Sequence, residues 1–372
     1  MSTALTPEHN FVSEQLGDVE ARVLFPEPRP NAKEVKFVTL FRNAPLTLEL
    51  GGRLSPVRVA YSTYGKLNEA RDNAVLVCHA LTGSSSVSSW WGDALGAGLM
   101  LDTAQDFIVC ANVLGGCYGS TGPATVDAAT NRNFGPDFPE ITVGDMIRVQ
   151  VALLEHLGVS RLKFAIGGSM GGMQVLELLR SHPERVAAGV VIGAPPRHSA
   201  WGLALYHLSR AAIERDPDFR GGRYGFQPRG LGLAREIATI SYRSAASFEL
   251  TQGRKPSPTD SSKAAIQTYL EHQGEKLLER FDANSYLSIS RALDRFDVTK
   301  AELEALPHPI LSVGISSDVL YLPGEIREIA ETAPHAQYWE LESPHGHDAF
   351  LLETRRLEAR VGAFLAELSP EG

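Results

Sequence analysis

Six short runs of apolar residues, each followed by a loop or a helical pattern, constrain the fold of this 372-residue chain most strongly. They occupy residues 73–81, 106–114, 161–169, 186–194, 309–318 and 337–343. The runs are apolar at successive positions, which is typical of strands buried on both faces in a parallel sheet covered by helices. Segments with apolar residues at helical spacing, such as "MQVLELLRSH", stand between them. The pattern predicts an α/β fold with a mostly parallel sheet and helices on both faces.

The chain divides into four segments by pattern. Residues 1–36 are polar and rich in proline, and we expect a surface arm there. The segments 37–196 and 301–372 carry the strands and form the predicted core, which opens with two alternating, antiparallel strands. Residues 197–300 contain helical patterns and no strong strand. A helical insertion between two sheet strands is most simply a lid over the carboxyl ends of the strands, where α/β sheets bind ligands.

Charge and composition exclude several classes of partner. The net charge of −9 argues against a general binder of nucleic acid or of anionic membranes. The first residues lack the basic start and apolar run of a secretion signal, and no run approaches the roughly 20 apolar residues that span a bilayer. Cys78, Cys110 and Cys117 show no metal-type spacing and are odd in number, so reduced thiols are expected. The sequence predicts a cytoplasmic protein with no nucleic-acid or membrane partner.

The stretch "AIGGSMGGMQ", residues 165–174, places Ser169 in a G-x-S-x-G pattern between a predicted strand and a predicted helix. This is the context of a nucleophile elbow, in which a sharp turn exposes the serine hydroxyl at a helix N-terminus. Unpaired backbone N–H groups at that end of the helix favour a developing negative charge. The alternative is a tightly packed glycine turn with an incidental serine.

A nucleophilic serine needs a base and a group that orients the base. Asp318 follows one buried strand, and His345 and His347 follow the next. The chain order Ser, Asp, His is the usual order of this fold, and all these groups emerge at the same sheet edge. Taken singly, Asp318 could instead cap a turn, and either histidine could be an ordinary loop residue. The spacing alone does not decide between the two histidines.

An oxyanion hole is also required, and backbone N–H groups can supply it. The residue after the nucleophile, Met170, gives one donor, and the loop "HALTG" after an earlier strand gives Leu81 as the natural second donor. We expect no metal and no bound cofactor, because the chain has no H-E-x-x-H motif and two loop histidines alone are an ordinary pair.

The first half of the predicted lid is rich in arginine and contains no lysine up to residue 243. The arginines are Arg197, Arg210, Arg215, Arg220, Arg223, Arg229, Arg235 and Arg243. Such a run usually forms a solvated helical face. Alternatively, it steers a polyanionic substrate toward the lid.

Five motifs of this sequence resemble the homoserine O-acetyltransferases, which are enzymes of the α/β-hydrolase fold. The motifs are "HALTG" (79–83), "NVLGGCYGSTGP" (112–123), "GGSMGGMQ" (167–174), "RFDANSYL" (280–287) and "GHDAF" (346–350). They stand in family order, and the resemblance runs from about residue 37 to the C-terminus. The second motif is far more specific than G-x-S-x-G.

The resemblance implies a role for each site residue. His347 would be the catalytic base, and Asp318 the carboxylate that orients it. Asp348 would bind the α-amino group of the substrate. Arg235 and Tyr242 would grip the amino acid from the lid, and their spacing of seven residues, two helical turns, lets both face one cleft.

The resemblance also implies the reaction and the assembly. An acetyl group would pass from acetyl-CoA through an acyl-Ser169 intermediate to the hydroxyl of L-homoserine, in ping-pong order, as a step of methionine biosynthesis. Acetyl-CoA would be a co-substrate, and the protein would be a homodimer packed through the lid. Two other functions use the same machinery: a homoserine or serine O-succinyltransferase, and a carboxylesterase. A non-enzymatic binding protein is disfavoured because all three triad residues are present.

Overall fold

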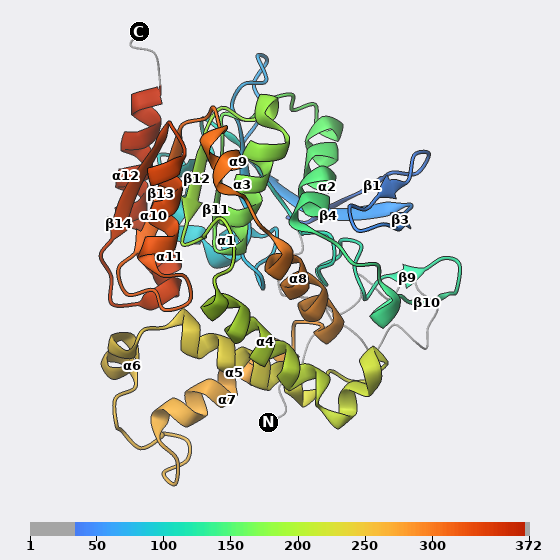
Figure 1. Ribbon diagram of the computed structural model, residues 1–372, viewed down its shortest axis with the longest axis vertical. Coiled ribbons are helices and arrows are strands. Elements are labelled where there is room, and N and C mark those ends of the chain that lie inside the picture. The colour runs from blue at the N-terminus through green and yellow to red at the C-terminus, as the bar shows by residue number, and fades with distance from the viewer. Residues whose placement is uncertain (1–33, 369–372) are drawn as a thin grey trace, which may run out of the picture.

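An eight-stranded sheet forms the centre of the molecule (Figure 1). The computed structural model describes residues 34–368, so residues 1–33 of the predicted arm lie outside the described residues. Along the sheet the strands are β1 (Lys36–Leu40), β4 (Val57–Tyr64), β8 (Phe107–Ala111), β5 (Ala74–Cys78), β11 (Phe164–Gly168), β12 (Gly189–Ile192), β13 (Ile310–Ile315) and β14 (Ala336–Leu341). β4 is antiparallel to β1 and to β8, and every other neighbouring pair is parallel. The mostly parallel sheet with an antiparallel opening is confirmed.

The continuously apolar runs are strands because both of their faces are covered. In β5, Val75 and Val77 belong to one buried apolar cluster, and Leu76 and Cys78 belong to the cluster on the other side of the sheet. This alternation follows from the two-residue period of a strand.

Among residues 34–368, three pairs of short strands lie outside the main sheet. They are β2 (Leu46–Thr47) with β3 (Arg53–Leu54), β6 (Leu95–Gly96) with β7 (Leu101–Asp102), and β9 (Val126–Asp127) with β10 (Arg132–Asn133). Strands of two residues are too short to leave a period in the sequence, and none of the six was predicted.

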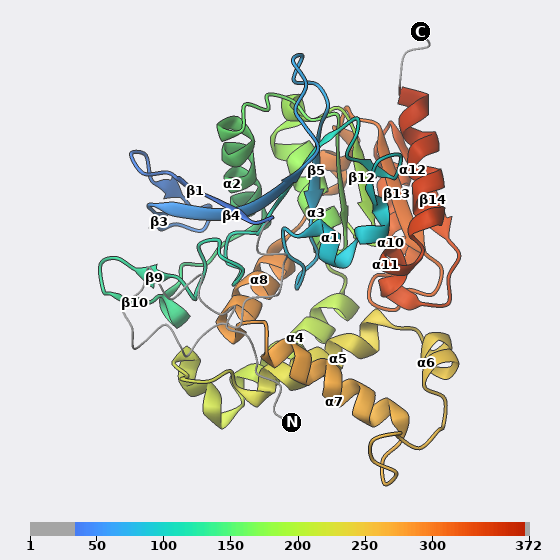
Figure 2. The ribbon, with the colours of Figure 1, turned by 180° about the vertical axis from the view of Figure 1, so that it is seen from behind.

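Helices cover both faces of the sheet (Figure 2). The helices that pack on one face are α2 (Val143–His156), α3 (Met170–Ser181), α9 (Lys300–Glu304) and α10 (Pro323–Thr332). Those on the other face are α1 (Val87–Trp90), α11 (Ala349–Leu352) and α12 (Thr354–Leu368). α2 starts at a capping box, in which Thr142 and Asp145 satisfy each other's backbone N–H groups.

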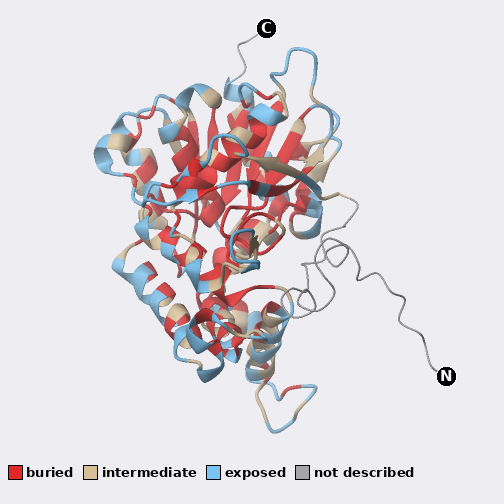
Figure 3. Cartoon of the chain, turned by 90° about the vertical axis from the view of Figure 1, so that its right-hand side faces the viewer, coloured by how far each residue is buried: buried red, intermediate tan, exposed pale blue. Residues whose placement is uncertain are grey.

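Five helices follow β12 and precede β13 in the chain, where the sequence predicts a helical segment. They are α4 (Ala200–Glu214), α5 (Arg229–Tyr242), α6 (Ala245–Thr251), α7 (Ala265–Leu278) and α8 (Ala283–Arg295). The segment leaves and re-enters the core at one place, since the Val298 N–H donates to the Pro196 carbonyl at 2.9 Å. Figure 3 shows that buried residues continue from the sheet into these helices. Together the views place them across one end of the sheet (Figures 1 and 3).

Candidate active site

Ser169 occupies a strained turn between β11 and α3. Its φ of 58° and ψ of −127° are rare for a residue that carries a side chain. The turn is held because the Ser169 N–H donates to the Ile192 carbonyl of the neighbouring strand at 2.9 Å. The Ser169 residue is only 5% exposed. This is the geometry of a nucleophile elbow.

The glycines around Ser169 provide the space that this turn requires. A Cβ at Gly167 would lie 2.3 Å from the backbone carbon of Gly171. A Cβ at Gly171 would lie 2.1 Å from the carbonyl oxygen of Cys78, at the end of β5. Since these contacts are with backbone atoms, no side-chain movement could relieve them. The turn, the first residues of α3 and the end of β5 therefore touch without intervening side chains.

Asp318 and His347 form a buried pair. The Nδ1–H of His347 donates to Asp318 Oδ2 at 2.6 Å, and the two side chains are 3% and 0% exposed. The other carboxylate oxygen of Asp318 accepts from the N–H groups of Leu320 at 2.8 Å and Tyr321 at 3.0 Å. His345, the alternative base, makes no bond to Asp318, and its Nδ1 is buried without a partner among the described residues. These bonds fix which nitrogen of His347 carries the proton.

The His347 ring lies beside the serine turn. A Cβ at Gly193, just after β12, would lie 3.4 Å from Cε1 of His347. The centre of the Phe350 ring is 5.7 Å from the centre of the His347 ring. The Phe350 ring also packs against Gly168, the residue before Ser169, where an added Cβ would lie 2.6 Å from the ring edge of Phe350. The Nε2 of His347 is buried and has no hydrogen-bond partner in the part of the chain that the structure describes. That nitrogen is therefore free to accept a proton.

The charges around His347 favour its protonated form. Burial lowers the pKa of His347, but the charge of Asp318, the hydrogen bond to it and the charge of Asp348 outweigh burial. The pKa of His347 therefore lies above its usual value of 6.5.

The three predicted substrate-binding residues gather around the same imidazole. The Tyr242 ring lies 5.8 Å from the His347 ring, and the Arg235 guanidinium lies 5.3 Å from the centre of the Tyr242 ring. Asp348 is 3.8 Å from Arg243. Burial raises the pKa of the Asp348 carboxyl, although the charges of Arg235, His347 and Arg243 act in the opposite direction. The structure thus brings an arginine, a tyrosine and a carboxylate from the lid and the core into one cluster.

The two predicted oxyanion donors are buried at adjoining backbone segments. Leu81 is 3% exposed and Met170 is fully buried. Neither of their N–H groups donates to a backbone or side-chain acceptor within residues 34–368. Buried N–H groups without an acceptor are rare, and an oxyanion site is one place where they occur.

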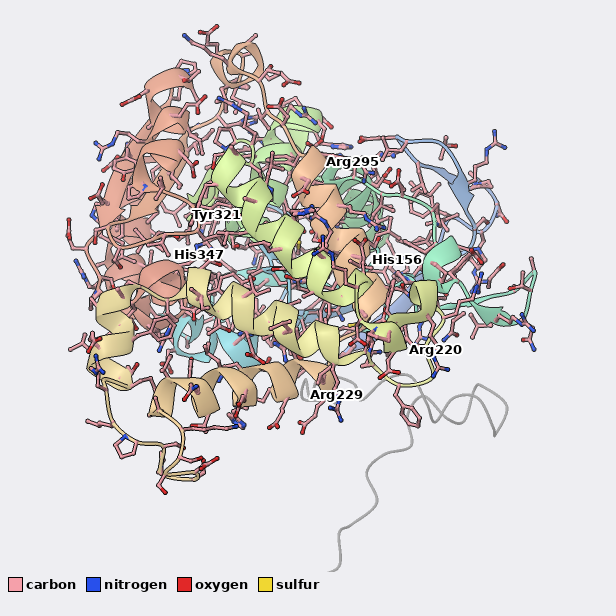
Figure 4. The ribbon with its side chains drawn as sticks, turned by 60° about the horizontal axis from the view of Figure 1, so that its bottom comes forward. His156, Arg220, Arg229, Arg295, Tyr321 and His347 are labelled. Atoms are coloured by element: carbon pink, nitrogen blue, oxygen red, sulfur yellow. The ribbon has the colours of Figure 1, made fainter. Side chains whose placement is uncertain are left out.

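Several residues of the site were missed by the sequence analysis. The Tyr321 ring lies 5.3 Å from the His347 ring (Figure 4), and its hydroxyl bonds to His198 Nε2 at 2.8 Å. The Nδ1 of the same histidine lies 3.1 Å from an oxygen of Asp294 on α8. Tyr321 stands three residues after Asp318, and that proximity was the one available signal. Nothing in the pattern pairs His198 with Asp294.

Four of the eight arginines between residues 197 and 243 form ion pairs. The pairs are Arg197 with Glu328, Arg210 with Asp294, Arg223 with Asp137 and Arg243 with Asp348. Arg235 lies over a tyrosine. Arg215, Arg220 and Arg229 are exposed and make no ion pair within the described residues. Among the eight arginines between residues 197 and 243, these three remain available to steer an anionic substrate.

No described helix is long and apolar enough to cross a membrane. Among residues 34–368, no group of three or more His, Cys, Asp or Glu side chains is placed to hold a metal ion. The three cysteines are buried and unpaired, and burial raises the pKa of each thiol.

Comparison with known proteins defines first the class and then the family. Residues 73–354 match the model of the α/β hydrolase fold, so the protein is an α/β-hydrolase-fold protein, as predicted. A homoserine O-acetyltransferase of Chloroherpeton thalassium is 46% identical over 345 residues, which cover 90% of this chain and 91% of that protein. The chain belongs to the homoserine O-acetyltransferase family.

Solved structures agree with this assignment. A homoserine O-acetyltransferase from Bacillus anthracis superposes with a TM-score of 0.81 at 26% identity, covering 89% of this chain and 97% of that one. Esterase E22 also gives a TM-score of 0.81, at 23% identity, covering 89% of this chain and 99% of its own. The second likeness concerns the fold alone.

Proposed function

We propose that this protein transfers an acetyl group from acetyl-CoA to the hydroxyl of L-homoserine, as a step of methionine biosynthesis. The observation that carries the proposal is the buried His347–Asp318 pair beside the strained Ser169 turn, in a chain 46% identical to a homoserine O-acetyltransferase. The α/β-hydrolase fold alone, without these residues, would not indicate a particular reaction.

In the first half-reaction, Nε2 of His347 accepts the Ser169 proton while the hydroxyl oxygen attacks the thioester carbon. Asp318 holds the imidazole and stabilises its positive charge. The N–H groups of Leu81 and Met170 bind the oxyanion of the tetrahedral intermediate. The carbon–sulfur bond then breaks, the thiol of CoA takes the proton from His347, and acetyl-Ser169 remains.

In the second half-reaction, the homoserine hydroxyl takes the place of the serine hydroxyl. Arg235 binds the substrate carboxylate through two parallel hydrogen bonds, and Asp348 binds the ammonium group. Tyr242 completes the grip from the end of α5. His347 removes the proton of the incoming hydroxyl and returns it to Ser169, which releases O-acetyl-homoserine.

Transfer rather than hydrolysis requires that water be kept from the acetyl-serine. We assign this role to α4 to α8, because Arg235 and Tyr242 on α5 form part of the residue cluster around His347. An esterase would need no amino-acid acceptor. A succinyltransferase would need an additional cation in the acyl pocket for the second carboxylate.

We further propose a cytoplasmic homodimer that packs through the lid. On α4, Trp201 and Leu208 are each 53% exposed, and on α5, Leu233 and Ile240 are 50% and 55% exposed. Each pair is seven residues apart and so lies on one helix face. We call these four residues the lid apolar face. A second copy of the chain would cover an apolar surface of this kind.

The test is release of free thiol from acetyl-CoA or succinyl-CoA, with and without L-homoserine or L-serine. We expect a rate that needs acetyl-CoA and homoserine together. Ser169→Ala should lower it by about 10⁴-fold or more, because the nucleophile is lost. The exposed Ser160→Ala is the matched control and should keep the wild-type rate.

Each other result would correct the proposal. A preference for succinyl-CoA or serine would change the substrate and keep the mechanism. Thiol release that is indifferent to amino acids would identify an esterase. Full activity of Ser169→Ala would rule out the mechanism through an acyl-serine intermediate.

A further inference from the structure

Two glutamine side chains are buried inside the apolar core next to the serine turn, and the mechanism above gives them no role. Gln174, on α3, is 0% exposed, and Gln150, on α2, is 2% exposed. Burying an amide costs free energy unless its polar atoms are bonded. Their hydrogen bonds therefore indicate what the two side chains stabilise.

The Gln174 amide bonds to two backbone segments at once. Its Nε2 donates to the carbonyl of His79 at 3.1 Å and to the carbonyl of Met170 at 3.3 Å. Its Oε1 accepts from Gln150 Nε2 at 2.7 Å, and Gln150 Oε1 accepts from the Cys78 thiol at 3.7 Å. A primary amide suits this position because it offers two N–H donors and one acceptor in a single plane.

The His79 side chain also fixes the start of this loop. Its Nδ1–H donates to the Ala80 carbonyl at 2.8 Å, and its Nε2 accepts from the Val113 N–H at 3.2 Å. Burial lowers the pKa of His79 to about 4, so the ring remains neutral and can keep both bonds. The loop that leads to Leu81 is thus held by side chains rather than by a regular element.

The geometry points to Gln174 as a positioning residue for the oxyanion hole. One carbonyl that it binds lies two residues before Leu81, and the other belongs to Met170, so the amide ties together the two segments that carry the proposed donors. The inference rests on the oxyanion hole of the proposed function. Gln150 bonds to the amide oxygen of Gln174 and to the Cys78 thiol, and it bonds to neither of these two carbonyls.

The expected size of the effect follows from how sharply kcat depends on the distance between the oxyanion and its N–H donors. Loss of one oxyanion donor lowers kcat by about 10²–10³-fold, and a displacement of about 1 Å can cost about 10²-fold. Loss of the tether loosens the donors without removing them. We therefore expect Gln174→Met to lower kcat by about 10- to 100-fold.

The experiment compares Gln174→Met with Gln150→Met in the full-length protein. Both remove one buried amide and keep a similar volume, but only the first frees the two backbone carbonyls. Acetyl transfer to homoserine and release of nitrophenol from 4-nitrophenyl acetate are measured for each, together with thermal unfolding. A trifluoromethyl ketone, whose bound oxyanion occupies the same hole, gives a third measurement.

We expect Gln174→Met to lower kcat and the affinity for the trifluoromethyl ketone by the same factor. The KM for homoserine should stay within about twofold, and Gln150→Met should change kcat by less than about threefold. Equal losses of kcat in the two variants, or a loss of thermal stability without a loss of ketone affinity, would overturn the inference.

A second variant covers the case in which Gln174→Met does not fold. Gln174→Glu keeps the shape, and its protonated carboxyl can still donate to one carbonyl. A buried carboxyl has a raised pKa, and its ionised form would repel both carbonyl oxygens. We expect a new fall in kcat as pH rises, absent from wild type, and an unchanged pH profile would count against the inference.

Failure of the proposed substrates would be visible separately. If the wild-type protein releases nitrophenol from the ester but transfers no acetyl group from acetyl-CoA, then the proposed function is wrong. The comparison of Gln174→Met with Gln150→Met on 4-nitrophenyl acetate still tests the positioning role in that case.

Discussion

At the scale of single residues, the function of the site depends on how the charges around one imidazole are balanced. His347 is buried, which disfavours its charged form, yet two carboxylates more than offset this effect. Asp318 acts through its charge and through a direct hydrogen bond, and Asp348 acts through its charge alone. In the proposed mechanism only the neutral imidazole can accept the serine proton, so the raised pKa of His347 should set the lower pH limit of activity.

We expect kcat/KM for 4-nitrophenyl acetate to rise with pH, with a midpoint above 6.5. Asp348→Asn removes a negative charge that raises the pKa of His347, so its midpoint should move to lower pH. The ester needs no amino-acid acceptor, so loss of homoserine binding does not affect the measurement. The exposed Asp93→Asn is the matched control and should leave the midpoint unchanged. A midpoint that stays fixed in Asp348→Asn would show that Asp348 does not influence the base.

The residues at the ends of the buried strands could be predicted because parallel strands share one carboxyl edge. Asp318, His345 and His347 were placed there from the pattern alone. The spacing left the choice between the two histidines open, and the family resemblance implied His347. In the structure His347, and not His345, bonds to Asp318. The loop before them is pinned by Ser317, whose hydroxyl bonds to the Ser343 carbonyl at 2.5 Å and accepts from the Gly346 N–H at 2.9 Å. No period in the sequence encodes such side-chain bonds.

At the scale of elements, the site depends on a direct contact between the start of α3 and the end of β5. The strands themselves were predictable because their apolar runs bury both faces, and α3 was predictable from its period. The closeness of their ends was not, since it arises from backbone packing at Gly171. Glycine is required there for space, against its low helix propensity.

Gly171→Ala should therefore destabilise the protein by about 2–4 kcal/mol, because a new Cβ meets the fixed Cys78 carbonyl. Gly324→Ala, near the start of α10, is the control, since a Cβ there meets nothing within 4 Å. It should stabilise by about 0.5–1 kcal/mol through helix propensity. Denaturant midpoints for both variants test this. Similar midpoints would mean that the contact relaxes without cost.

At the scale of the whole molecule, the proposed dimer would connect the lid apolar face with the proposed acceptor site. The sequence could predict a helical insertion, but the packing of α4 on α5 and the exposure of one face of each helix required the structure. α5 carries two residues of this face and also Arg235 and Tyr242, of which Tyr242 lies beside His347 and Arg235 lies over Tyr242. Covering the face with a second copy would hold α5 in place and thereby position both substrate-binding side chains.

The double variant Leu208→Glu with Ile240→Glu should therefore change both mass and kinetics. Burying two carboxylates in an apolar interface is unfavourable, so light scattering should show a monomer where wild type is a dimer. The KM for homoserine should rise by about 3- to 10-fold as α5 loosens, a factor equivalent to about 0.7–1.4 kcal/mol. Leu352→Glu, 52% exposed on α11 at the other end of the chain, should alter neither.

A double variant that remains dimeric would place the interface elsewhere. A monomer with unchanged KM would separate assembly from the acceptor site, because α5 would then hold Arg235 and Tyr242 through its contacts within one chain.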